Sequence, residues 1–83
     1  MNLYLISQED RFGRYTYNEL VVCAATEDEA RLIHPAEYSQ PDPWSNGGNH
    51  TWASSPDKVA VEFIGVAESS IRKGIICASY NGG

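Results

Sequence analysis

Short apolar runs, each bounded by polar or turn residues, recur along the chain and predict its strands. Residues 2–7 (NLYLIS) combine aromatic and branched residues over a length typical of a strand, and a polar stretch follows them. In residues 20–25 alternate side chains would point to opposite faces of a sheet. Residues 58–66 and 75–80 show the same character. The pattern predicts four strands.

The stretch between the first two runs contains Gly13 among charged residues and two tyrosines. It reads either as a long hairpin loop over residues 8–17 or as a ribbon that continues both strands.

A capping box predicts one short helix after the second strand. A Thr26 side chain at the N-cap can accept a bond from a backbone N–H, and Glu29 can reach back three residues later. Acidic residues in the first turn also favour the positive end of the helix dipole. Pro35 disfavours helical geometry at His34, so the helix is expected to begin at Glu27 and to stop at His34.

The element order predicts an α+β fold. Strand, strand, helix, long loop, strand and strand give a four-stranded antiparallel sheet with the helix packed on one face. Hairpins fit both strand pairs, and residues 68–73 fit one helical turn closed by Gly74. With 83 residues, the chain is long enough for one compact domain over residues 1–83, and the spatial order of the strands stays open.

The segment 35–57 interrupts every regular pattern, with four prolines and the turn residues 46–49 (NGGN). Long irregular loops in small domains are mostly functional or disordered. Tyr38, Trp44 and Trp52 disfavour disorder because aromatic side chains are costly to leave in water. We expect an ordered flap with His50 between its tryptophans. The tryptophans either extend a thin core or present a recognition surface.

The first loop is the second candidate binding region. Arg11, Arg14, Tyr15 and Tyr17 belong to residue types that are enriched at interface hot spots. The same set would also suit a stacked nucleotide whose phosphates are held by arginine. A third interpretation is a pair of cross-strand tyrosines beside solvated arginines. The candidate binding residues are Arg11, Arg14, Tyr15, Tyr17, Tyr38, Trp44, His50 and Trp52.

Charge argues against direct nucleic-acid binding. Six Lys and Arg stand against eleven Asp and Glu, a formal net charge of −5, whereas phosphate backbones need clustered cations. The acidic residues are scattered, so mimicry of DNA is not favoured either. No apolar run approaches the ~20 residues of a membrane span, and the chain shows no secretion signal.

Catalytic and metal-binding motifs are weak. Cys23 and Cys77 lie in apolar runs, where a free cysteine behaves as a small hydrophobic residue. Two cysteines without a secretion signal do not form a disulfide framework, which favours a reducing cytoplasm. With His34 and His50 they would form a zinc site only if all four converged. His34 is expected to contact carbonyls at the helix end. We therefore expect no enzyme activity, no metal and no cofactor.

Five stretches of the sequence carry a resemblance when taken together: residues 4–8 (YLISQ), 25–31 (ATEDEAR), 33–35 (IHP), 65–67 (GVA) and 74–81 (GIICASYN). They resemble small uncharacterised proteins encoded by bacteriophages and prophages. The resemblance covers about half the chain and implies a setting, an accessory protein in the bacterial host cytoplasm, with no family activity attached.

That setting favours a stoichiometric inhibitor of a bacterial immune system, of the anti-CRISPR type, which binds and occludes a host defence protein or complex. A standard interface buries ~800 Å² per partner, which a domain of this size can supply. Two alternatives stay open: a sponge for a nucleotide immune signal, built from Arg11, Arg14, Tyr15 and Trp52, and a virion or assembly accessory protein. Unprotected edge strands also predict a homodimer.

Overall fold

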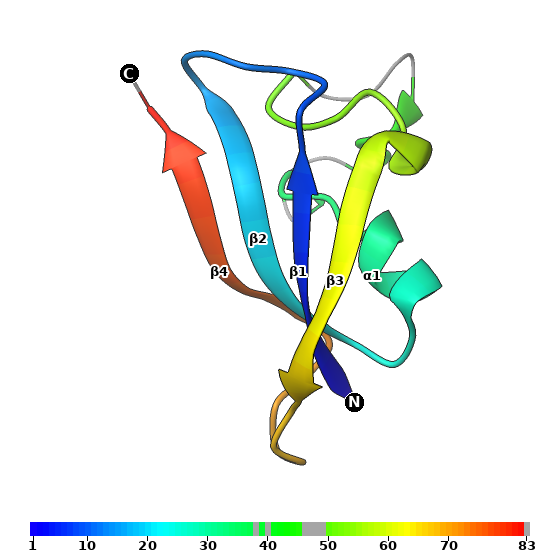
Figure 1. Cartoon of the computed structure of the whole chain (residues 1–83). Helices are drawn as coiled ribbons and strands as arrows, with labels where there is room; N and C mark the ends of the chain where they lie inside the picture. The colour runs from blue at the N-terminus through cyan, green and yellow to red at the C-terminus, as the bar shows by residue number, and fades with distance from the viewer. Residues whose placement is uncertain (38, 40, 46–49, 83) are drawn as a thin grey trace.

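A computed structural model describes residues 1–37, 39, 41–45 and 50–82 of the chain. The described residues form a four-stranded antiparallel sheet with one short α-helix, which confirms the α+β prediction (Figure 1). The elements are β1 (Asn2–Gln8), β2 (Thr16–Ala24), α1 (Glu27–Leu32), the single 3₁₀ turn η2 (Pro56–Lys58), β3 (Val59–Val66) and β4 (Gly74–Asn81).

The strands lie in the order β3-β1-β2-β4, so the hairpin β1–β2 forms the centre of the sheet. The predicted hairpin between the last two strands is wrong, because β3 pairs with β1 and β4 pairs with β2. The link 67–73 crosses three strand spacings of about 4.8 Å each. Seven extended residues reach about 23 Å, which is ample for this crossing.

Strand β2 begins at Thr16 rather than at Leu20, so the ribbon interpretation of the first loop is correct for its second half. The register runs from Asn2 opposite Ala24 to Ser7 opposite Glu19. A shorter loop, residues 9–15, therefore turns the chain between β1 and β2.

Helix α1 begins as the capping box predicts. The Thr26 side chain accepts a hydrogen bond from the backbone N–H of Glu29 at 3.2 Å. The helix ends at Leu32, earlier than expected, because Ile33 is already extended while its N–H still bonds to the Ala30 carbonyl. Ala30 and Ile33 are buried, so the helix is held by its packing against the sheet.

The core lies between the sheet and the layer formed by α1 and the long segment. Among its members is Trp52, whose side chain is 0% exposed. Trp52 of the segment 35–57 therefore extends the core, which is one of the two roles that the sequence left open for the tryptophans. The buried cluster consists of Tyr4, Ile6, Leu20, Val22, Ala24, Ala30, Ile33, Trp52, Ala53 and Val59.

The link between β3 and β4 is a turn instead of the expected helical turn. The Ile71 N–H bonds to the Glu68 carbonyl at 3.0 Å, and Gly74 adopts a φ of 137°. Cys23 is buried beneath this link, with its Sγ 4.0 Å from the Ile71 carbonyl oxygen. Cys77 is exposed on β4.

Candidate interaction surface

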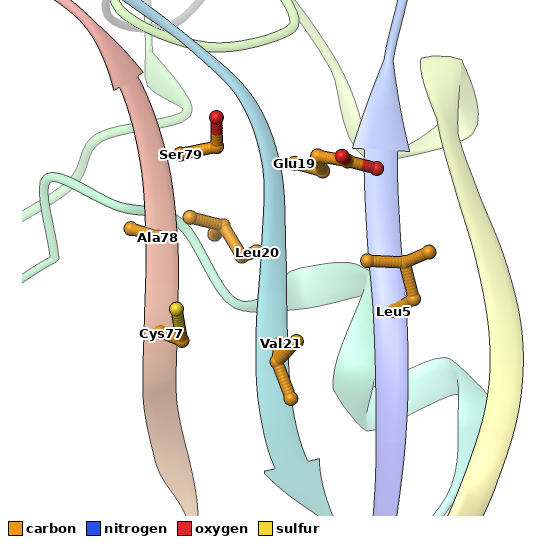
Figure 2. A pocket seen from close by; sticks show the side chains of 7 residues that line it. All are labelled: Leu5, Glu19, Leu20, Val21, Cys77, Ala78 and Ser79. Atoms are coloured by element: carbon orange, nitrogen blue, oxygen red, sulfur yellow. The ribbon is translucent and has the colours of Figure 1, made fainter.

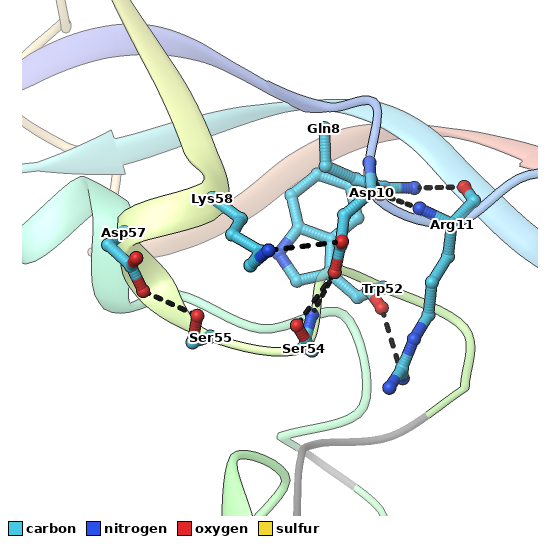
Figure 3. Close-up of polar contacts among 8 residues, drawn as sticks. All are labelled: Gln8, Asp10, Arg11, Trp52, Ser54, Ser55, Asp57 and Lys58. Carbon is cyan, nitrogen blue, oxygen red and sulfur yellow. Dashed lines mark hydrogen bonds and ion pairs between the residues drawn. The ribbon is translucent and has the colours of Figure 1, made fainter.

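The two regions that the sequence marks as binding candidates are joined at one end of the sheet (Figure 3). The Tyr17 N–H donates to the Thr51 carbonyl at 2.7 Å. The Arg11 guanidinium donates to the Trp52 carbonyl at 3.4 Å. Segments about forty residues apart in sequence therefore support one another.

The buried amide of Gln8 organises the β1–β2 loop from inside. Its Oε1 accepts the backbone N–H groups of Asp10 and Arg11 at 2.9 and 2.7 Å. Its Nε2 donates to the carbonyls of Arg11 and Tyr17 at 2.7 and 2.9 Å. One side chain thus makes four hydrogen bonds, three to the loop and one to Tyr17 of β2, and fixes the course of the loop.

Asp10 ties the same loop to the chain before β3. Its Oδ1 lies 3.6 Å from the Lys58 ammonium, and its Oδ2 accepts two hydrogen bonds from Ser54. The bonds from Ser54, together with the charge of Lys58, lower the pKa of this carboxyl below its ordinary value. The carboxylate is therefore the form that holds the two segments together.

The backbone of Tyr15 is in the left-handed region, with a φ of 66°. Such a conformation is unfavourable for a bulky side chain and persists only where neighbouring bonds impose it. Here the Tyr15 N–H bonds to the Asn81 carbonyl, and the Gly13 carbonyl accepts from both Thr16 Oγ1 and Asn81 Nδ2 at 2.7 and 3.0 Å. The loop is fastened to the end of β4.

This arrangement exposes a group of side chains that we call the aromatic tip, formed by Phe12, Arg14, Tyr15 and Tyr80. Phe12 is 75% exposed, and the ring of Tyr80 packs on that of Tyr17 with centroids 4.7 Å apart. Phe12 and Tyr80 were not among the predicted site residues. The aromatic content of the loop was the signal for Phe12, whereas the place of Tyr80 depends on strand order.

The tryptophans of the long segment take different positions. Trp52 is fully buried, so its assignment to a recognition surface is wrong, because a thin core needs its large ring. Trp44 is half-buried; its Nε1 donates to the Leu32 carbonyl at 3.1 Å and its ring meets that of His34 edge-on at 4.7 Å. Trp44 is thus mainly a packing residue.

His34 is buried, and its Nδ1 accepts the Ala36 N–H at 2.9 Å. The predicted contact with helix-end carbonyls is therefore wrong for Nδ1, which acts as an acceptor. Burial, with a smaller effect from the charge of Arg11, lowers the pKa of His34 to about 4. His50 is exposed, and Tyr38 lies outside the described residues. No three described His, Cys, Asp or Glu residues gather as a metal site.

A shallow depression of about 140 Å³ lies on the sheet between β1, β2 and β4 (Figure 2). The register places Leu5, Val21 and Cys77 side by side across these strands, with Glu19 opposite Ser79 at one end. The depression is smaller than the ~300 Å³ at which ligand pockets begin. Its apolar floor suits a contact with another protein surface better than an enclosed ligand.

Comparison of the chain with protein-family models, with curated proteins and with solved structures finds no match. In the part of the chain that the structure describes, no helix is long and apolar enough to cross a membrane.

Proposed function

We propose that the chain is a non-catalytic protein-binding domain that occludes its partner through the aromatic tip. Phe12, Arg14 and Tyr15 are exposed on a loop held by hydrogen bonds, and aromatic residues and arginine dominate interface hot spots. The observation that carries the proposal is the left-handed backbone of Tyr15. An exposed tyrosine in a conformation that suits glycine has a cost that a purely structural role leaves unexplained.

A protein partner is favoured over a nucleotide. The sponge hypothesis relied on Trp52 as a stacking group, and its ring is enclosed in the core. The depression on the sheet is small and apolar, whereas an anionic nucleotide needs depth and converging cations. Arg11 is also engaged with the Trp52 carbonyl.

The resemblance to phage-encoded proteins supplies the class of partner. We assign the target to a bacterial defence system and the mode of action to stoichiometric inhibition in the host cytoplasm, as in anti-CRISPR proteins. A folded loop with preorganised aromatic residues binds without a large ordering cost, which suits inhibition by occlusion.

The test is affinity capture from a bacterial host, read by quantitative mass spectrometry. Phe12→Ser removes a tip residue, and Val66→Ser removes a side chain that is equally exposed, at 75%, on β3. The wild-type chain and Val66→Ser should retain one defence protein, which Phe12→Ser loses by roughly 10- to 30-fold. Equal recovery by both variants would exclude the tip, and a retained protein without a defence role would exclude the target class.

Calorimetry with cyclic dinucleotides tests the alternative directly. The folded chain should give flat titrations, while saturable heat at micromolar concentration would favour the sponge and contradict occlusion of a protein.

A further inference from the structure

One face of the sheet packs on the core, and the other does not. Alternate side chains of β1 point to opposite faces, and Tyr4, Ile6 and Gln8 are buried on the core side. Leu5 and Ser7 therefore point to the second face, where both are only half-buried. In Figure 2, which looks onto this second face, the ribbon of α1 passes behind the strands.

The strand register arranges the second face in two rows that cross all four strands. Residues directly opposite one another in antiparallel strands share a face, so Leu5 lies in one row and Ser7 in the next. Apart from Glu62 at its end, the row of Leu5 is apolar, and the depression in Figure 2 lies over part of it. We call these eight positions the open face: Glu62, Leu5, Val21 and Cys77 in the first row, and Ala60, Ser7, Glu19 and Ser79 in the second.

The size of the open face limits what can cover it. Beyond the first row the link 67–73 covers the sheet, since Cys23, two residues after Val21, is buried beneath Ile71. Four strands and two rows therefore span about 19 by 14 Å. This flat area of about 270 Å² is a third of the ~800 Å² that one partner contributes to a standard interface. A single α-helix, about 10–12 Å wide and about 18 Å long over 12 residues, has the matching size.

Charge selects the kind of helix. Glu19 and Glu62 are exposed, neither forms an ion pair within the described part of the chain, and no position of the open face is basic. Two such faces brought together would oppose four carboxylates without a cation, so charge disfavours a second copy of the chain. Nucleic acid and anionic membranes are disfavoured for the same reason. A cationic helix is the occupant that complements the face.

The positions of the two carboxylates indicate the spacing of the cations. Glu19 and Glu62 stand two strands and one row apart, about 12 Å along the diagonal. On one side of a helix, positions i and i+7 are about 10.5 Å apart, and positions i+3 and i+4 lie between them. Lysine or arginine at the outer two positions then reaches the carboxylates, and apolar side chains at the inner two lie over Leu5 and Val21.

We propose that the open face binds a basic amphipathic helix of a partner protein. The contact side of the helix carries cations at i and i+7 and apolar residues at i+3 and i+4. The inference goes beyond the proposed function, because the open face contains no residue of the aromatic tip and its test needs no host protein.

A synthetic helical peptide with capped ends tests the proposal. The probe carries Lys at i and i+7 and Leu at i+3 and i+4 in an uncharged host, and the matched peptide replaces both Lys by Glu. By NMR near physiological salt, the Lys peptide should shift the amide signals of the open face with a Kd on the order of 100 μM. The Glu peptide should bind at least about tenfold more weakly. Unmoved signals, or equal binding of the two peptides, overturn the proposal.

Two double variants with the same change of charge locate the site. Glu19→Gln with Glu62→Gln should weaken binding of the Lys peptide by roughly 3- to 10-fold. Glu37→Gln with Asp42→Asn removes two exposed carboxylates of the long segment and should bind as the wild type does. All four side chains are exposed, so the circular dichroism spectrum should stay unchanged in both. Equal weakening in the two variants would mean attraction by net charge alone and would overturn the assignment.

Dilution of the chain without peptide tests the competing occupant. The amide signals of the open face should not move with concentration, and movement would make the occupant a second copy and overturn the proposal. Phe12→Ser should bind the Lys peptide as the wild type does, because Phe12 lies outside the open face. Failure of the peptide experiment is therefore distinguishable from failure of the capture experiment.

Discussion

One carboxylate oxygen of Asp10 accepts both the backbone N–H and the hydroxyl of Ser54, each at 2.8 Å. The two residues are separated by 44 positions in the chain. Through this contact the loop that carries the aromatic tip is fixed to the segment that carries the central tryptophan of the core (Figure 3). The stability of the tip and the packing of the core are therefore coupled.

Asp10→Ala should loosen both segments. Loss of the carboxylate leaves the Ser54 N–H without its acceptor and removes the ion pair with Lys58. We expect a lower melting temperature and faster amide exchange in residues 51–54. Glu9→Ala, which removes the adjacent exposed carboxylate, is the control and should change neither. Equal exchange in the two variants would show that Asp10 does not hold the segment.

The buried His34 should make stability depend on pH. Its pKa falls from the ordinary 6.5 to about 4 in the folded chain, so the unfolded chain binds more protons between these values. The associated stability is complete above pH 6.5 and is lost as pH falls toward 4. Between pH 7.5 and 4.5 the contribution of this residue to the loss should be about 2 to 3 kcal/mol.

Denaturant unfolding of His34→Gln at both pH values checks this contribution, because glutamine can accept the Ala36 N–H without titrating. The decline in unfolding free energy should be smaller than in the wild type, whereas His50→Gln should match the wild type. If His34→Gln does not fold, the ring carbon shifts of wild-type His34 give the answer by NMR. Protonation of the ring near pH 6.5 would contradict the expectation.

The helix cap gives a prediction of stability alone. Thr26→Ala removes the acceptor for the Glu29 N–H and should cost about 1 kcal/mol of unfolding free energy. Thr26→Ser keeps the hydroxyl and should retain most of it. Thermal unfolding of the two variants decides the matter, and equal losses would mean that the methyl group matters more than the cap.

Tyr15→Gly separates strain from function. Glycine adopts the left-handed backbone at no steric cost, so this variant should stay within about 1 kcal/mol of the wild type in unfolding free energy while it loses capture of the partner. Tyr17→Gly, by contrast, removes a ring packed on the core and on Tyr80 and should cost about 2 kcal/mol or more. A strongly destabilised Tyr15→Gly would show that the tyrosine is structural.

Local signals in the sequence were enough to predict the elements but not their arrangement. The capping box at Thr26 placed the helix start, and alternation placed each strand to within a few residues. The position of β4 beside β2 depends on a crossing by residues 67–73, whose turn residues fit a helical end equally well. Strand order depends on such non-local pairing, which short-range patterns do not encode.

The candidate site was predictable in its residue types and only partly in its members. Arg14 and Tyr15 were recognised because arginine and tyrosine are common at interfaces, and both are exposed. Trp52 was chosen for the same reason, as an aromatic residue of a kind common at interfaces, yet its side chain is buried in the core. Tyr80 joins the tip through the bond between Tyr15 and Asn81, a contact between residues at the two ends of the chain that no local pattern reveals.

The central position of the β1–β2 hairpin has a consequence for the order of assembly. During synthesis the hairpin and α1 emerge from the ribosome first. Strand β4, which pairs with the outer side of β2, begins about fifty residues after β2 ends. Until then β2 keeps an unpaired margin that can capture a neighbouring nascent chain. A pause before β3 leaves both margins of the hairpin unpaired, whereas a pause before β4 leaves only that of β2, so the earlier pause should lower the soluble yield more.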